Sequence, residues 1–179
     1  MKYISILRGI NVSGKKKIKM TDLKALYEAE GFTEVTTYIQ SGNVIFDSGK
    51  QDRMKLITII EKAIEKKYQF HVPVDLRTHQ ELESVINQCP FEEAKQEENG
   101  TKILVTFLKK SPSKENIKDL LEKVKSPEQL QVSNNNVYLY CPNGYGKSKL
   151  TNNLIEKKLK TSATTRNWKS IKKLHELSL

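Results

Sequence analysis

The two halves of the 179-residue chain repeat one order of periodic segments. Each half contains a strand, a helix, two strands, a helix and a strand, judged from apolar residues that alternate in strands and recur every three or four positions in helices. This β-α-β-β-α-β order is that of the ferredoxin-like fold. The sequence therefore predicts an α+β protein with two tandem ferredoxin-like domains, each built on an antiparallel sheet.

The predicted domains are 1–78 and 101–179, joined by a helical, acidic linker over 79–100. Residues 81–100 contain six glutamates and only one lysine. A short helix over 79–88 opens this linker, and an extra helix over 166–177 closes the chain. The remaining elements are predicted as strands over 2–7, 71–76, 102–110 and 161–165, hairpins over 35–48 and 128–141, and helices over 21–31, 52–69, 112–124 and 150–159.

Positive charge is concentrated at the two ends of the chain. The net charge of +10 divides into +6 for residues 1–20, +7 for residues 141–179 and −3 for the residues between them. Such segregation is typical of a surface that binds phosphates. The alternative is that the lysines form ordinary solvated faces.

The first basic loop follows the strand over 2–7 and precedes the helix that Thr21 is predicted to cap. A strand, a glycine-containing loop and a helix N-terminus together can hold an anion on backbone N–H groups. A structural interpretation, in which Arg8 pairs with a glutamate and Asn11 caps a turn, stays open. The candidate ligand-binding residues of this loop are Arg8, Asn11, Lys15 and Lys17.

The second basic loop, CPNGYGKSKL at 141–150, imitates a phosphate-binding P-loop. Gly146-Lys147-Ser148 fits the end of the motif, but Cys141 replaces its first glycine and Pro142 removes an N–H donor. A nucleotide hydrolase is therefore excluded. A weaker phosphate contact from Lys147, Ser148 and Lys149 remains, with Ser148 as an ordinary helix N-cap in the alternative interpretation.

The third stretch is TTRNW at 164–168. Thr164 or Thr165 is predicted to cap the last helix, which places Arg166 and Asn167 in its first turn. A cation is unfavourable there, so Arg166 is expected to make another contact and is a candidate ligand-binding residue. Trp168 shares helical spacing with Ile171 and Leu174, which favours a buried core residue over a platform for stacking bases.

Four segments together resemble one protein family: LRGINVSGKKKIKM, YIQSGNVIF, GYGKSKLTNNLIEKKL and ATTRNWKSIKKL. They are similar to a bacterial family known as the domain of unknown function DUF1697, which has two ferredoxin-like domains in tandem. The resemblance spans nearly the whole chain and implies the same fold. It implies no activity, cofactor or catalytic residue, because the family has none assigned.

The sequence favours some classes of function over others but identifies no particular activity. No catalytic constellation is recognisable, the three histidines are scattered without metal-ligand spacing, and no cofactor is expected. No apolar run spans a bilayer and the apolar part of the opening segment is too short for a signal peptide, so a cytoplasmic protein is expected. Cys89 and Cys141 are expected as two buried free thiols, with a single disulfide between them as the alternative.

The leading hypothesis is a polyanion binder, with nucleic acid as the ligand. The aromatic signature of RNA-binding sheets is absent, which disfavours recognition by base stacking. The alternatives are an enzyme or sensor for a small phosphorylated or carboxylated ligand held between the two domains, and a protein–protein assembly module. For either kind of anionic ligand, the two basic ends are predicted to converge on one groove. Arg8, Lys15, Lys17, Lys147, Lys149 and Arg166 are predicted to border it, with Asn11 and Ser148 adding neutral contacts.

Overall fold

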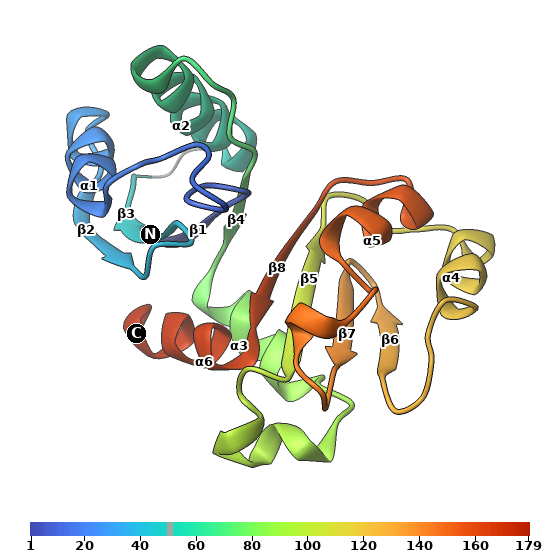
Figure 1. The fold of residues 1–179 in the computed structure, drawn as a ribbon. Helices are drawn as coiled ribbons and strands as arrows, with labels where there is room; N and C mark the ends of the chain where they lie inside the picture. Colours follow the sequence, from blue (N-terminus) through green and yellow to red (C-terminus); the bar gives the residue numbers. More distant parts are fainter. Residues whose placement is uncertain (50–51) are drawn as a thin grey trace. The chain divides into compact units, whose positions relative to one another are not determined.

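The computed structural model of the chain describes residues 1–49 and 52–179. These residues form two four-stranded antiparallel sheets and several helices (Figure 1). The predicted α+β class and the two antiparallel sheets are confirmed. The chain divides into two compact units: unit 1 comprises Met1–Glu83 and Leu174–Leu179, and unit 2 comprises Ser84–Lys173.

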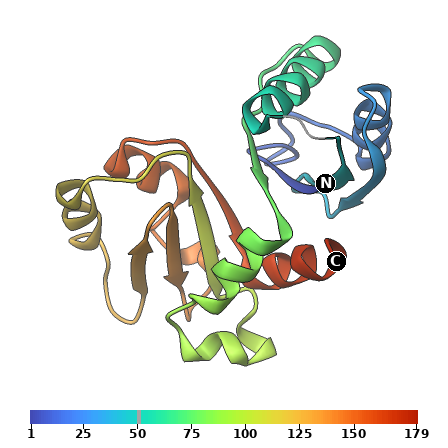
Figure 2. The ribbon, with the colours of Figure 1, turned by 180° about the vertical axis from the view of Figure 1, so that it is seen from behind.

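Unit 1 contains one sheet and two helices that pack on it. The strand order is β2-β3-β1-β4, and all three pairings are antiparallel. Buried side chains of α1 and α2, among them Leu26 and Ile60, share one core with the strand residues Leu7 and Phe46. The elements are β1 (Lys2–Leu7), α1 (Met20–Ala29), β2 (Thr33–Tyr38), β3 (Asn43–Asp47), α2 (Arg53–Tyr68) and β4 (Val74–Arg77), as Figure 2 shows from behind.

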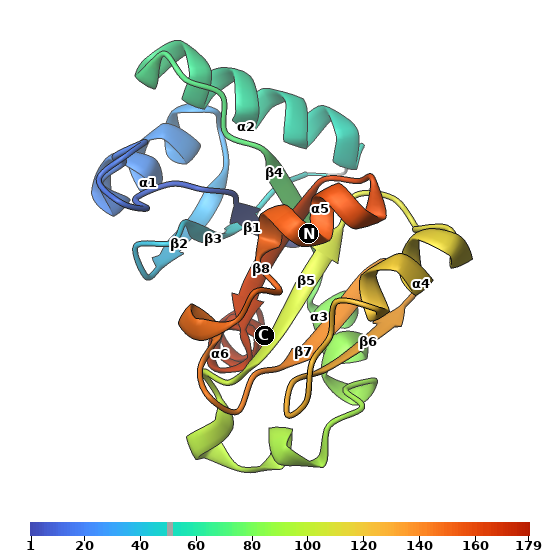
Figure 3. The ribbon, with the colours of Figure 1, turned by 45° about the vertical axis from the view of Figure 1, so that its right-hand side comes forward.

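Unit 2 repeats this order around its own core. The strand order is β6-β7-β5-β8, again antiparallel throughout. Helices α4 and α5 lie on one face of the sheet, where Leu120 and Ile155 join Leu104 and Leu139 (Figure 3). The elements are β5 (Ile103–Leu108), α4 (Lys114–Leu121), β6 (Gln129–Ser133), β7 (Asn136–Tyr140), α5 (Asn152–Leu159) and β8 (Ala163–Asn167), with short 3₁₀ helices η1 (Glu92–Lys95), η2 (Glu97–Asn99) and η3 (Tyr145–Lys147).

Helices α3 (His79–Asn87) and α6 (Trp168–Leu177) contain the points at which the chain passes from one unit to the other. The second half of α3 belongs to unit 2, where the Tyr138 hydroxyl donates to the carbonyl of Val85 at 3.0 Å. This bond ties β7 to α3. Burial raises the pKa of Tyr138 to about 12, so its hydroxyl keeps the proton that it donates.

Three predicted helix starts are corrected by the structure. Lys19, not Thr21, is the N-cap of α1, and its side chain makes no capping bond. Thr151, not the Ser148 of the alternative interpretation, caps α5 by accepting the N–H of Leu154. For α6, Asn167 rather than Thr164 or Thr165 provides the cap, because its side-chain oxygen accepts the N–H of Ser170. None of the helices described in residues 1–49 and 52–179 has both the length and the apolar character needed to cross a membrane.

Candidate functional site

Asn11 organises the first basic loop. Its side-chain amide donates to the carbonyls of Ile18 and Gln40 at 2.9 and 2.8 Å, and its oxygen accepts the N–H of Ile18 at 2.9 Å. Asn11 itself has φ +55°, a conformation that asparagine tolerates well. The structural interpretation of Asn11 therefore agrees with these contacts: both ends of its amide hold the loop closed.

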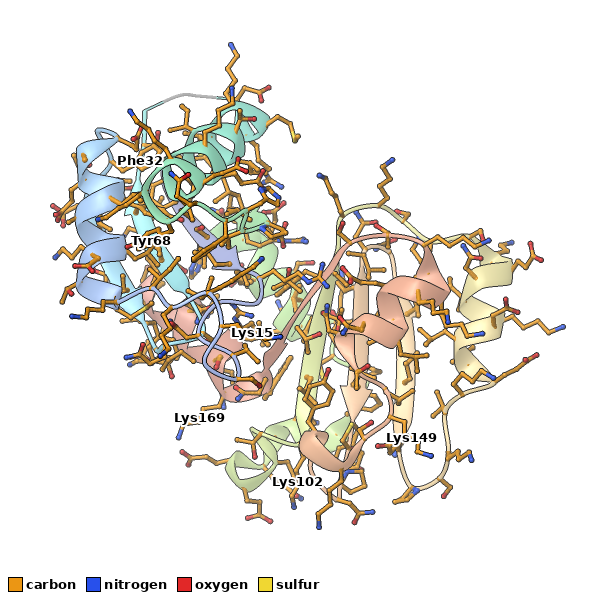
Figure 4. All side chains as sticks on the ribbon, turned by 45° about the horizontal axis from the view of Figure 1, so that its top comes forward. Lys15, Phe32, Tyr68, Lys102, Lys149 and Lys169 are labelled. Atoms are coloured by element: carbon orange, nitrogen blue, oxygen red, sulfur yellow. The ribbon has the colours of Figure 1, made fainter. Side chains whose placement is uncertain are left out.

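The lysines of this loop differ in their contacts. Lys16 donates to the carbonyl of His71 at 2.7 Å and lies 5.9 Å from the ring centre of Phe70. Lys15 and Lys17 are exposed, and neither forms an ion pair with any residue in the described part of the chain. Figure 4 shows the Lys15 side chain on the loop before α1. Arg8 is half-buried at the end of β1, and its backbone N–H donates to the carbonyl of Pro73 at 3.0 Å.

An open hollow of about 770 Å³ lies beside this loop, within unit 1. Lys17 and Lys19 line it together with the start of α1. The first intrahelical bond of α1 runs from the N–H of Leu23 to the carbonyl of Lys19, so the three N–H groups before Leu23 have no helical acceptor. The first turn also carries Asp22, whose carboxylate contributes a negative charge to the hollow.

Tyr68, at the end of α2, also lines this hollow, and Figure 4 labels its side chain. Its hydroxyl oxygen is buried and has no hydrogen-bond partner among the described residues. Burial, followed by the charge of Asp22, raises the pKa of Tyr68, so the hydroxyl stays protonated and is a donor at neutral pH. A buried hydroxyl without a partner costs about 1–3 kcal/mol, which a bound acceptor would recover.

The second basic loop uses several of its backbone donors internally. The N–H groups of Gly144, Lys147 and Ser148 donate to the carbonyls of residues 141, 144 and 145, respectively, at 2.9, 3.2 and 3.0 Å. The Ser148 hydroxyl accepts the N–H of Leu150 at 3.0 Å. A P-loop instead directs its N–H groups at a phosphate, so this geometry agrees with excluding a nucleotide hydrolase. Lys147 and Lys149 of this loop are exposed, and Figure 4 labels the Lys149 side chain.

Arg166 lies in β8 rather than in a helix. It pairs with Val105 in the sheet, is only 8% exposed, and donates from its guanidinium to the carbonyl of Thr165 at 2.9 Å. The predicted position in the first turn of α6 is therefore wrong. The polar run of β8 lacks the apolar alternation by which strands are recognised, and this run continues two residues further than predicted.

The predicted site residues fall into two sets. Arg8, Asn11, Lys15 and Lys17 belong to unit 1, and Lys147, Ser148, Lys149 and Arg166 belong to unit 2. Their convergence on one groove stays a prediction. The two cysteines are free, and burial raises the pKa of both Cys89 and Cys141, which keeps the thiols protonated at neutral pH.

A second cluster in unit 1 went unrecognised in the sequence. His79 and Glu83, one turn apart on α3, meet His175 of α6, and one ligand-type atom of each lies within 4.8 Å of the other two. The imidazole rings of His79 and His175 stack with centres 4.2 Å apart. The spacing of His79 and Glu83 was the available signal, because residues four apart lie on one helical face. The contribution of His175 depends on tertiary structure.

The start of α3, which positions this cluster, is fixed by a capping box. Glu81 accepts the N–H of Thr78 at 2.8 Å, and the Thr78 hydroxyl accepts the N–H of Glu81 at 3.3 Å. Arg53 of α2 also grips the Glu81 carboxylate with two bonds of 2.9 and 3.0 Å. Burial opposes ionisation of Glu81, but the bonds from Arg53 and Thr78 outweigh it and lower the pKa of this carboxyl.

Glu81→Gln is expected to lower the free energy of unfolding at pH 7 by about 1 kcal/mol, because the pair is partly exposed and screened by solvent. A lowered pKa means that the ionised form stabilises the fold. The contribution is present above the unfolded-state pKa of about 4.3 and is lost as the pH falls through the folded-state value. Urea unfolding at pH 7 and in acid should show the difference between variant and parent shrinking in acid. Glu65→Gln, on the exposed side of α2, is the control.

A family model described as "Protein of unknown function (DUF1697)" matches residues 1–138. The chain belongs to this family. It is also similar in structure to a conserved bacterial protein, SP0830 from Streptococcus pneumoniae, with a TM-score of 0.77 and 21% sequence identity over 99% of this chain and 98% of that one. At that identity the likeness shows the fold alone. A search of curated proteins gave no match. DUF1697 membership thus confirms the resemblance and assigns no activity.

Proposed function

We propose that this protein binds a small phosphorylated or carboxylated ligand in the hollow of unit 1. The observation that carries the proposal is the meeting of three kinds of donor around one space of about 770 Å³: the ammonium groups of Lys17 and Lys19, the uncapped start of α1, and the partnerless hydroxyl of Tyr68. Sites for small ligands have volumes of about 300–1,000 Å³ and contain a few convergent polar groups.

Charge and helix geometry support an anion in this position. A helix N-terminus carries about half a positive charge, and the lysines add two full charges against the single one of Asp22. The Asn11 contacts hold the loop closed without a ligand, so little ordering is needed on binding. The proposal differs from the sequence hypothesis in placing the small ligand within unit 1.

A nucleic acid is the second candidate. It is supported by exposed Lys15, Lys147 and Lys149, none of which forms an ion pair among the residues that the structure describes.

Free thiols with raised pKa values support the associated proposal of a cytoplasmic protein. The repeated strand order of the two sheets supports a ferredoxin-like assignment with domains over 1–78 and 101–179.

Titration of the full chain with pyrophosphate tests the leading candidate. We expect saturable heat release in calorimetry, and the double variant Lys17→Ala/Lys19→Ala should bind at least about tenfold more weakly, since one charge-assisted hydrogen bond contributes about 1.5–3 kcal/mol. Lys55→Ala/Lys62→Ala, which removes the same two charges from exposed positions on α2, should bind like the parent. Equal affinities for the Lys17→Ala/Lys19→Ala variant and the control would contradict a site in this hollow.

The same variants separate a small ligand from a nucleic acid. Binding of a short single-stranded RNA should weaken with salt, and each lost phosphate contact should reduce the logarithmic salt slope by about 0.7. If Lys15→Ala and Lys149→Ala lower that slope while pyrophosphate does not bind, the nucleic acid candidate replaces the small ligand. If neither probe binds, both candidates fail.

A further inference from the structure

We propose that His79, Glu83 and His175 form a binding site for a transition-metal ion of the Zn²⁺ type. The three residues belong to unit 1, and the site is independent of the hollow beside the basic loop. Two imidazoles and one carboxylate are a ligand set that zinc accepts, with a water molecule completing a four-coordinate site. Hard ions such as Mg²⁺ and Ca²⁺ prefer oxygen ligands and fit this set poorly.

Ser178 fixes the protonation pattern of His79. The Ser178 hydroxyl donates its one proton to the carbonyl of His175 at 2.8 Å, because a carbonyl can only accept. The same oxygen lies 3.0 Å from Nδ1 of His79, so it accepts the Nδ1 proton there. Neutral His79 therefore carries its lone pair on Nε2. A hydrogen bond that holds the second ring nitrogen is the usual way in which proteins orient a metal-binding histidine.

His175 supplies the second, independent indication. Its Nε2 atom is buried and has no hydrogen-bond partner among the described residues. Leaving such a nitrogen unpaired costs about 1–3 kcal/mol, and coordination of a metal would satisfy it. The two rings stack, with centres 4.2 Å apart and planes inclined by 20°.

To bind an ion, the cluster must contract and one imidazole must rotate out of the stack, because a metal lies in the plane of each ring that ligates it. Zinc lies about 2.0–2.2 Å from nitrogen and oxygen ligands, which places neighbouring ligand atoms about 3.3 Å apart in a tetrahedral site. The three atoms here lie within 4.8 Å of one another. Glu83 is exposed and can rotate inward, whereas the α3 backbone is held by the capping box of Thr78 and Glu81. A cavity of about 370 Å³, lined by His79 and Ser178 among others, lies beside the first of the three residues.

Titration of the tag-free full chain with Co²⁺ tests the site directly. We expect one equivalent to bind in the micromolar range with the visible absorption of a four-coordinate cobalt site, and Zn²⁺ to displace it. Zn²⁺ should also raise the melting temperature, because an ion that binds only the folded state stabilises it. His175→Ala should abolish both effects. His71→Ala, which removes the exposed third histidine of the chain, should change neither.

Two further variants keep the test decisive if His175→Ala folds poorly. Glu83→Gln alters an exposed side chain, so it should fold like the parent and bind Co²⁺ at least about tenfold more weakly. Ser178→Ala should weaken binding about 10–100-fold through the orientation of His79. The proposal is overturned if the parent shows no saturable binding, if Glu83→Gln and His71→Ala bind alike, or if the cobalt spectrum shows thiolate ligation by Cys89 or Cys141.

Discussion

Trp168→Ala is expected to lower the free energy of unfolding by about 3–5 kcal/mol, the range found when large aromatic side chains are removed from cores. Trp168 is only 3% exposed and begins α6, whose Ile171 and Leu174 are fully buried at helical spacing. The N–H of the next residue, Lys169, donates to the carbonyl of Gly100 at 2.9 Å and fixes the start of the helix. The indole therefore has little freedom to relax, and truncation leaves a cavity.

Urea unfolding followed by circular dichroism measures this loss. Lys172→Ala, an exposed change on the same helix, should change the free energy of unfolding by no more than about 0.5 kcal/mol, as surface substitutions usually do. A Trp168→Ala protein that unfolds like the parent but no longer binds pyrophosphate or RNA would instead place Trp168 in a ligand site.

Gly42→Ala is expected to destabilise the protein by about 2–5 kcal/mol. Gly42 has φ +80°, where a side chain costs about 1–2 kcal/mol. A Cβ atom there would lie 2.5 Å from Cδ1 of Ile10 and 2.9 Å from Cβ of Leu7, both buried. The Cβ atom of Leu7 is fixed by its backbone, and the Leu7 N–H already donates to the carbonyl of Gly42 at 2.8 Å. Relieving the clash therefore requires a shift of β1. Such overpacking adds about 1–3 kcal/mol.

Gly14→Ala separates the two causes of this loss. Gly14 has a similar φ of +74°, but a Cβ there would meet no atom within 4 Å. It should therefore cost only the conformational part, about 1–2 kcal/mol. Equal losses for the two variants, measured by urea unfolding, would show that the close approach to Leu7 and Ile10 contributes nothing.

Elements with strong periodicity could be predicted from the sequence, and those fixed by tertiary structure could not. The buried stripe of α1 and the positive φ of Asn134 at a hairpin turn follow from residue spacing and turn chemistry. Strand β8 was predicted to end before Arg166, because its polar residues carry no pattern and its partner β5 decides how far it extends.

The same distinction holds for the candidate sites. The lysines of the first loop are evident in the sequence, but the role of Tyr68 depends on where α2 ends relative to α1, which no local pattern specifies. The capping box of Thr78 and Glu81 was readable and would have placed His79 and Glu83 on one helical face. Only the packing of α6 brings His175 to them.

The return of Leu174–Leu179 to unit 1 has a consequence for the order in which the protein matures. These residues are synthesised after the whole of unit 2, so the nascent first unit lacks Ser178 and His175 until translation has passed Lys173. The Lys2 ammonium, which donates to the carbonyl of Leu179 at 2.5 Å, likewise gains this acceptor only after unit 2 has been synthesised. A fragment ending at Glu83 should therefore be incomplete, and any ion bound by the two histidines can be acquired only after unit 2 has been synthesised.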